Sequence, residues 1–441
     1  MRGSAVRAHW LMLRKTFRVT RAWNALKIGL SYGISVLLRR PVVWGLPPTV
    51  MIEPTNVCNL RCPLCPTGAG TLGRPGRFMP FDTYCAVIDE LQQSAVVVLL
   101  WNQGESFMHP QFLPMVRYAS DRALWTWAST NGHFLPDPDA VVRSGLGTLV
   151  VSLDGASQAT YEAYRRGGDF AKVVEGLRAL AAAKRRLRSA TPLIHLQFIV
   201  MRHNEHEVPT IASLAAQWGV DRLTVKTAMI YDDADIGVWL PRDPRHRRYR
   251  VVPGADGRPH FAMKHGYKNR CKRLWAQPVV NAGGEIAVCC FDKDVDFPMG
   301  AVPDGSFRQA WTSERFRAFR QSILLNRSRY EMCRNCGEGV KLNVARRDVP
   351  LPDSSRRRRP ATDQTPPPDD RPTPEVDPDV ARAIETAARS RERPGGSRPA
   401  RRAGRTGVAG MSLGQGPRPI EDLRPRRTVL GRLASWRGRW R

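Results

Sequence analysis

The sequence of 441 residues is poor in cysteine, with nine in all, an odd number. Its first 30 residues also lack the short apolar segment and the small-residue cleavage site of an export signal. Both features argue against a secreted protein held together by disulfides and favour the reducing cytoplasm. Eight of the nine cysteines fall into two groups along the chain, and clustered cysteines in a reducing compartment more often bind metal than form bridges.

Acidic residues are absent from residues 1–50, which carry nine Arg and Lys side chains. Residues 341–441 contribute about +12 of the total charge of +29, and the 290 residues between these two ends contribute only about +8. A nucleic-acid partner is therefore not expected, because the positive charge lies on the ends of the chain and not on its central region.

Long apolar runs are absent as well. The apolar stretch within residues 22–48 is interrupted by Asn24 and Lys27 and closed by two arginines, so it is too short and too polar to span a bilayer. We expect this segment to be helical and to pack on the domain that follows. A peripheral membrane contact, and with it a membrane-associated location in the cytoplasm, is the alternative.

The end of the chain is rich in proline and arginine. From Pro350 onward it has too few apolar residues to offset the entropy lost on ordering, so a disordered basic tail is predicted.

The middle of the chain alternates apolar, β-branched runs with amphipathic stretches. The apolar runs are residues 49–54, 96–102, 124–130, 148–154, 194–201 and 222–227. Near-continuous apolar strands separated by helical patterns are typical of a parallel sheet covered by helices. Six such units predict an α/β fold, a partial (β/α)6 TIM-like barrel.

Polar motifs follow the first four of these runs, in the order EPTNVCNLRC, NQGES, STNG and SLDG. A single Asn-Gly or Asp-Gly pair would be ordinary turn chemistry. At the carboxyl ends of successive parallel strands, where such sheets bind their ligands, the four motifs together predict one site.

Three cysteines occupy eight positions of the first motif: Cys58, Cys62 and Cys65. Three thiolates can hold three corners of an iron-sulfur cube and leave the fourth iron open to a small molecule. Zinc is the alternative, although it would need a fourth ligand that is not close in the sequence.

The spacing Cys-x3-Cys-x2-Cys after the first strand of a partial barrel resembles the radical S-adenosylmethionine (radical SAM) superfamily over about residues 45–340. The resemblance implies a [4Fe-4S] cluster whose open iron is chelated by S-adenosylmethionine. Reductive cleavage then gives a 5'-deoxyadenosyl radical that takes hydrogen from the substrate, with flavodoxin or ferredoxin as electron donor. Leu64 and Ser106 replace residues that are usually aromatic and proline in this family, but neither change removes a cluster ligand.

The later motifs match the family's cofactor contacts. Gly104 and Glu105 stand where a glycine-glutamate motif accepts hydrogen bonds from the methionyl ammonium group. Arg165 resembles an arginine that pairs with the methionyl carboxylate, and the adjacent Arg166 is the alternative. The resemblance places the remaining contacts, to ribose and carboxylate, at Ser129, Thr130, Asn131, Ser152 and Asp154.

A second group of five cysteines lies downstream, and four of them supply a set of thiolates: Cys271, Cys289, Cys333 and Cys336. The last two are spaced as in metal-binding knuckles, and the residues around Gly283-Gly284 predict a hairpin that presents Cys289. This region resembles the auxiliary-cluster domain of SPASM/twitch radical SAM enzymes, which implies a second [4Fe-4S] cluster. Cys290 could replace Cys289 as ligand, and structural zinc remains an alternative at this site.

Four segments are thus expected: a basic, apolar helical segment at 1–44, the barrel at 45–230, the auxiliary-cluster domain at 231–345 and the tail at 346–441. We expect an oxidoreductase or lyase that acts on a small-molecule, sugar or lipid-linked substrate, because residues 1–50 look too short and too apolar for a leader-binding module. A peptide-modifying maturase, an RNA-modifying enzyme and a non-catalytic iron-sulfur electron carrier are the alternatives.

Overall fold

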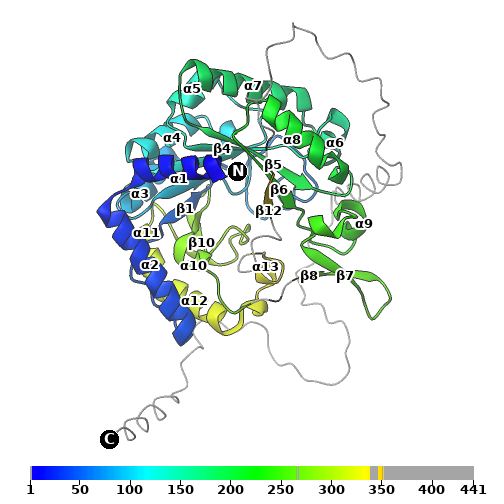
Figure 1. Cartoon of the computed structure of the whole chain (residues 1–441). Helices are drawn as coiled ribbons and strands as arrows, with labels where there is room; N and C mark the ends of the chain where they lie inside the picture. Colours follow the sequence, from blue (N-terminus) through cyan, green and yellow to red (C-terminus); the bar gives the residue numbers. More distant parts are fainter. Residues whose placement is uncertain (1, 265, 267, 338–345, 350, 352–441) are drawn as a thin grey trace, which may run out of the picture.

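The computed structural model describes residues 2–264, 266, 268–337, 346–349 and 351 (Figure 1). Most of the predicted tail therefore lies outside the described residues. The chain begins with two helices, α1 (Arg2–Thr16) and α2 (Val19–Leu38).

Six parallel strands follow, paired in chain order, and each apolar run expected from the sequence forms one of them. They are β1 (Thr49–Ile52), β2 (Val97–Leu100), β3 (Trp125–Thr130), β4 (Thr148–Ser152), β5 (Leu193–Val200) and β6 (Arg222–Thr227). The connecting helices are α3 (Phe81–Leu91), η1 (Ser106–Met108), α4 (Phe112–Asp121), α5 (Pro138–Arg143), α6 (Gln158–Tyr164), α7 (Phe170–Arg186), η2 (Glu205–Glu207) and α8 (Val208–Gln217). All five residues of β4 are buried, as expected of a central parallel strand.

The sheet does not close into a full barrel. Its strand order is β11-β10-β9-β1-β2-β3-β4-β5-β6-β12, so the outer edges of β1 and β6 pair with later strands and not with each other. On one side β9 (Val279–Val280) runs parallel to β1, and on the other β12 (Arg346–Val349) runs antiparallel to β6. The predicted α/β fold with a partial barrel is confirmed.

The C-terminal region continues the sheet of the barrel through β9. Its other strands are β10 (Glu285–Ala287) and β11 (Pro298–Ala301), and a separate hairpin is formed by β7 (Tyr249–Pro253) and β8 (Pro259–Met263). Its helices are α9 (Asp235–Trp239), η3 (Pro244–His246), α10 (Arg273–Ala276), α11 (Phe307–Thr312), α12 (Glu314–Asn326), η4 (Arg327–Arg329) and α13 (Glu331–Arg334).

The hairpin predicted around Gly283-Gly284 is formed by β9 and β10. Gly284 has a φ of +87°, and a Cβ atom there would lie 2.0 Å from the Val302 carbonyl oxygen, so the turn requires glycine. The domain boundaries drawn from the sequence stay predictions.

The N-terminal helices pack on the barrel through a buried arginine. The Arg21 guanidinium donates to the carbonyl oxygens of Gln92, Arg122 and Ala123 at 2.6 to 3.0 Å, and to that of Thr16 at 3.1 Å. Each donor of a buried guanidinium that finds a carbonyl avoids a desolvation cost, so these bonds hold α2 against the ends of α3 and α4. Among the described residues, no helix combines the length and the apolar character needed to cross a bilayer.

Candidate active site and second cysteine site

The three-cysteine loop leaves β1 at the carboxyl edge of the sheet. Within it the Cys65 N–H donates to the Cys62 carbonyl at 3.1 Å, which folds the last two cysteines into a tight turn. Burial raises the pKa of the Cys62 thiol to about 12; the Arg165 guanidinium opposes this shift, and the Cys65 and Cys58 thiols add to it. The three thiols therefore lie near one another, and their ionised form needs a cation beside it.

Gly104 and Glu105 lie behind this loop. A Cβ atom on Gly104, whose φ is +76°, would sit 2.5 Å from the Thr55 carbonyl oxygen, so only glycine lets the turn after β2 approach the cysteine loop. This contact allows the Glu105 N–H to donate to the Val57 carbonyl at 2.8 Å. The sequence motif thus has a steric cause in addition to any role toward a cofactor.

The Glu105 carboxylate is buried and connects two of the predicted motifs. It accepts hydrogen bonds from the backbone N–H of Asn131 at 2.6 Å and of Phe107 at 3.1 Å. Burial raises its pKa, although these hydrogen bonds work in the opposite direction. The carboxylate fixes the STNG turn at the end of β3 beside the cysteine loop, where the Asn131 side chain donates to Asn59 Oδ1 at 2.8 Å and lies 3.8 Å from Cys58 Sγ.

Arg165 and Asp154 form a buried ion pair in the same place. The Asp154 carboxylate is fully buried, and its Oδ2 lies 2.6 Å from both Nε and Nη2 of Arg165. The third guanidinium nitrogen lies 4.0 Å from Cys62 Sγ. Burial alone would lower the pKa of Arg165, but Asp154 and Cys62 more than reverse this effect and raise it. A fixed positive charge therefore faces the cysteine loop.

The remaining predicted contacts lie on β3, on β4 and directly after α6. Thr130 is buried, and its hydroxyl accepts from the Gly132 N–H at 2.9 Å, which supports the turn. Ser129 and Ser152 lie on the ends of the adjacent strands β3 and β4. The Arg165 guanidinium faces Cys62, and the Arg166 carbonyl accepts from the Arg61 N–H of the cysteine loop at 3.0 Å.

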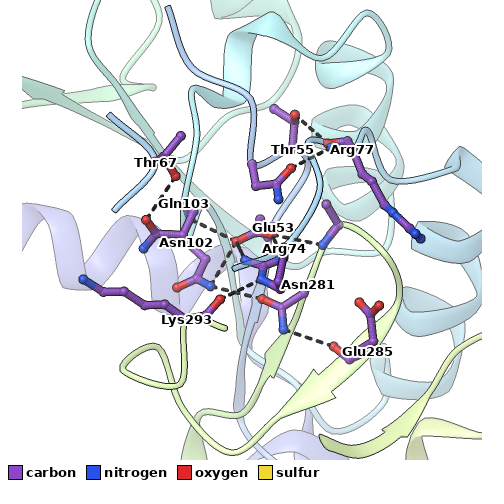
Figure 2. A network of polar contacts seen from close by, with 12 residues as sticks. Glu53, Thr55, Thr67, Arg74, Arg77, Asn102, Gln103, Asn281, Glu285 and Lys293 are labelled. Atoms are coloured by element: carbon purple, nitrogen blue, oxygen red, sulfur yellow. Dashed lines mark hydrogen bonds and ion pairs between the residues drawn. The ribbon is translucent and has the colours of Figure 1, made fainter. Parts of the chain in front are cut away.

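Glu53 was missed by the sequence analysis. It is fully buried directly after β1, and Arg74 binds both of its carboxylate oxygens, at 2.9 and 3.0 Å (Figure 2). Backbone N–H groups of Gln103 and Ala282 donate to it at 3.0 and 3.2 Å. The signal was present in the sequence, because an acidic residue that directly follows an apolar strand and precedes a metal-binding loop requires a partner.

The network of Glu53 joins the barrel to the C-terminal region. Arg74 Nε donates to the Lys293 carbonyl at 2.6 Å, and Asn102 donates both to Glu53, at 3.0 Å, and to Asn281 Oδ1, at 3.2 Å (Figure 2). One carboxylate thus holds together the cysteine loop, the turn after β2 and the C-terminal hairpin.

A cavity of about 290 Å³ opens beside Cys65. Its walls come from the turn after β2, from β5 and β6 and from the C-terminal region, and include Gln103, Gln197, Lys226, Arg248 and Lys293. Within the described part of the chain, none of the side chains that line it is acidic. The cavity therefore presents positive charge next to the cysteine loop.

The second group of cysteines gathers in the C-terminal region. Burial raises the pKa of Cys289, and Cys290, Cys271 and Cys336 raise it further. Burial likewise raises the pKa of Cys333, where Cys271 adds to the effect and Arg327 opposes it. The fold therefore brings together the four thiols named from the sequence.

Cys290 points to a different environment from that of Cys289. Its Sγ lies 3.3 Å from an Arg273 guanidinium nitrogen, and it packs with the cluster of Met51 and Val279. Cys289 instead packs against the main core together with Cys271 and Cys333.

All nine cysteines are free thiols. Over the described residues, no three His, Cys, Asp or Glu side chains form a ready-made site for a metal ion. Three thiols on one loop and four thiols in the C-terminal region are nevertheless donor sets that fit iron-sulfur clusters.

Two protein families match this chain. Residues 52–215 match the Radical SAM superfamily, and residues 271–337 match the iron-sulfur cluster-binding domain called SPASM. The first match contains the three-cysteine loop, and the second contains all five cysteines of the second group.

Among curated proteins, the chain is 26% identical over 309 residues to the PqqA peptide cyclase of Gluconobacter oxydans, covering 66% of this chain and 82% of the relative. It is 32% identical over 292 residues to the mycofactocin maturase MftC of Mycobacterium ulcerans, covering 61% and 76%. The solved structure of Streptococcus suis SuiB bound to S-adenosylmethionine is similar with a TM-score of 0.48 at 12% identity, covering 64% of this chain and 69% of SuiB. That structural likeness is too distant to bear on function.

Proposed function

Because this chain belongs to the radical SAM superfamily and carries a SPASM domain, we propose that it is a maturase that modifies a peptide. The proposal is carried by the two curated relatives, a peptide cyclase and a maturase, which align with more than three quarters of their own length. They favour the peptide-modifying alternative over the small-molecule, sugar or lipid-linked substrate that we expected from the sequence. An oxidoreductase or lyase type of reaction and an external electron donor belong to the same proposal.

Its cofactors are S-adenosylmethionine and two [4Fe-4S] clusters, one of them auxiliary. When bound, the open cluster supplies the electron for reductive cleavage of S-adenosylmethionine. The residues that would hold it are Cys58, Cys62 and Cys65. Those that would hold the auxiliary cluster are Cys271, Cys289, Cys333 and Cys336.

The residues around the first loop would bind and orient the cofactor. Arg165 is held by Asp154 on one side and presents its remaining nitrogen toward Cys62, so it is positioned to attract a carboxylate beside the loop. Glu105 offers a buried negative charge on the other side of the loop, suited to an ammonium group. If the methionyl part of S-adenosylmethionine were bound between Arg165 and Glu105, its carboxylate and its ammonium group would each face a group of opposite charge.

The substrate would enter the cavity next to Cys65. Lys226, Arg248 and Lys293 line it, and a volume of about 290 Å³ suits one or two side chains of a longer peptide better than the whole peptide. The proposed substrate is therefore a peptide that presents an acidic group near the residue to be modified.

The test is 5'-deoxyadenosine release and peptide mass after anaerobic reconstitution, with S-adenosylmethionine and a strong reductant. The probes are synthetic precursor peptides encoded beside the gene, each supplied in an acidic form and in a form with Asp and Glu replaced by Asn and Gln. We expect the acidic form to raise 5'-deoxyadenosine release and to change in mass, and the amide form to do neither.

The control is the triple variant Cys58→Ala/Cys62→Ala/Cys65→Ala, which should release nothing. Turnover of a sugar or lipid-linked metabolite in place of every peptide would overturn the proposal. Equal turnover of the acidic and amide peptides would show that the substrate is a peptide but needs no acidic group.

A further inference from the structure

The two N-terminal helices expose an unusual amount of apolar surface. Of the sixteen large hydrophobic side chains that are exposed in the described part of the chain, eleven lie within the first 44 residues. These are Val6, Trp10, Leu13, Phe17, Val19, Trp23, Leu26, Leu30, Leu37, Leu38 and Trp44. Single exposed hydrophobic residues need no explanation, but a concentration of this kind marks an interaction surface.

The exposed residues follow the helical period. In α1 they recur at steps of four and three residues through Val6, Trp10 and Leu13. In α2 the same steps connect Val19, Trp23, Leu26 and Leu30. Because residues at these steps share one side of a helix, each helix presents a continuous apolar stripe to its surroundings.

The buried side of α2 is, by contrast, mostly polar. Its buried residues are Arg21, Ile28, Ser31 and Ser35. Between them, the half-buried Asn24 donates to the Leu46 and Ser94 carbonyls at 2.8 and 3.2 Å. Ile28 and the partly buried Tyr32 and Val36 are the apolar part of this side. The leucines and the tryptophan of α2 are exposed, whereas a helix that served only to cover the barrel would turn them inward.

The helices cannot simply rotate to hide the apolar stripes. The Arg21 guanidinium is engaged with four carbonyl groups, and Lys15 of α1 donates to Ser120 Oγ at 2.8 Å and to the Gly145 carbonyl at 3.1 Å. A rotation would break these bonds and leave a buried guanidinium without hydrogen-bond partners, which is strongly unfavourable. The apolar face is therefore a fixed feature of the fold.

Positive charge surrounds this face. Residues 1–50 contain no Asp or Glu and nine Arg and Lys. Arg14 lies over the Trp10 ring at 5.4 Å and Lys27 over the Trp23 ring at 5.6 Å. Tryptophan beside Arg or Lys, on the apolar side of a helix that lies flat, is the composition of a segment that binds the interface of an anionic bilayer.

We propose that α1 and α2 form a docking face for an anionic lipid surface, which holds the enzyme at a membrane without spanning it. The tryptophans and leucines enter the interface, and the surrounding Arg and Lys side chains contact lipid phosphates.

Charge also argues against two other partners for this face, a second copy of the chain and residues 352–441. A second copy of this chain would bring the cations beside the apolar stripes, such as Arg14 and Lys27, against their own copies, although Gly29 and Gly33 leave open space on α2 where another helix could approach. The remaining sequence at 352–441 is strongly basic as well, so it offers no complement to the face.

The test is co-sedimentation of the full chain with vesicles of phosphatidylcholine, with and without phosphatidylglycerol. We expect binding to vesicles that contain phosphatidylglycerol and little binding to phosphatidylcholine alone. The double variant Trp10→Ser/Trp23→Ser should bind about tenfold or more weakly, because two large aromatic side chains no longer enter the interface. Deleting residues 1–44 would be a poor test, because it removes the buried Arg21.

The matched control is Phe134→Ser/Leu325→Ser, which changes two exposed hydrophobic residues elsewhere and should bind like the wild type. Circular dichroism and iron content should be unchanged in both double variants. Unchanged vesicle binding by Trp10→Ser/Trp23→Ser would overturn the proposal and assign binding to the basic tail. The wild type could instead fail to bind vesicles and form a concentration-dependent dimer that Trp10→Ser/Trp23→Ser abolishes. That result would overturn the proposal and show that the apolar face binds a second copy of the chain.

Discussion

The two cysteine sites of this molecule are built in opposite ways. The first takes three thiols from eight consecutive positions of one loop and surrounds them with charged groups of both signs, Glu105, Asp154 and Arg165. The second collects four thiols from residues 271–336, across strands and helices, and Phe297, Phe319 and Tyr330 pack on one another in the same core.

This difference in donor number and surrounding charge determines which ligands each site can bind. Three donors and matched charges leave a side of the first site suited to a polar ligand. Four donors would complete the second site, and the buried Arg327, whose pKa is raised by Cys336, Cys271 and Cys333, lies beside it. The donor count of the first site therefore suits a cluster with one open position, whereas four protein donors would close the coordination of the second.

Removing one thiol from each site should have the largest effects, and the effects should differ between the sites. Cys58→Ala should abolish 5'-deoxyadenosine release, because two thiols on one loop cannot retain the open cluster. Cys333→Ala should keep uncoupled cofactor cleavage but lose about four irons and most peptide turnover. Iron content and 5'-deoxyadenosine release, measured side by side, test both expectations. Cofactor cleavage that survived in Cys58→Ala would show that the sites have been assigned in the wrong order.

The buried cations offer a second comparison. Asp154→Asn leaves the Arg165 charge without its partner, so we expect S-adenosylmethionine binding to weaken about 100-fold and the free energy of unfolding to fall by about 3 kcal/mol. Arg327→Gln should leave cofactor binding intact and accelerate loss of the auxiliary iron. Calorimetric binding of S-adenosylmethionine and urea unfolding measure these effects. Equal weakening of cofactor binding in both variants would contradict the separation of the two sites.

The sequence predicted the first site better than the second for a physical reason. All three of its cysteines and its flanking strand are local, so spacing and periodicity suffice, and each of the six apolar runs became a strand. The partners of Glu53 are Arg74, Gln103 and Ala282, up to 229 residues away, and no local pattern reports such pairing. The choice between Cys289 and Cys290 also depends on tertiary packing, because neighbouring residues differ only in the direction of their side chains.

Substitution of Glu53 tests whether the contact between the two domains couples the two cysteine sites. In Glu53→Gln the Arg74 guanidinium loses its carboxylate, and we expect a loss of about 2 to 3 kcal/mol in stability with a clear fall in peptide turnover. The matched control is Glu90→Gln. Glu90 also joins the barrel to the C-terminal region, since it accepts from Ser306 Oγ at 2.6 Å and the Phe307 N–H at 2.9 Å, but it lies on the outer helix α3.

The control should lose stability without a matching loss of turnover per folded enzyme. Denaturant unfolding and turnover corrected for iron content separate the two variants. If Glu53→Gln loses no more turnover than Glu90→Gln, the carboxylate only holds the domains together.

The smallest expected effect concerns the neighbouring thiols of the second site. Cys290→Ser should retain about eight irons in total, because the Cys290 side chain packs near Met51 and Val279 and its Sγ contacts Arg273. Its stability should change by less than about 1 kcal/mol, as is usual for replacing a half-exposed thiol by a hydroxyl. Cys289→Ser should instead lose the auxiliary iron, because serine replaces a thiol donor that packs on the same core as Cys271 and Cys333. The reverse pattern of iron contents would assign the ligand to Cys290, and the closed site would then have to form by a rotation of the hairpin end that turns Cys289 outward.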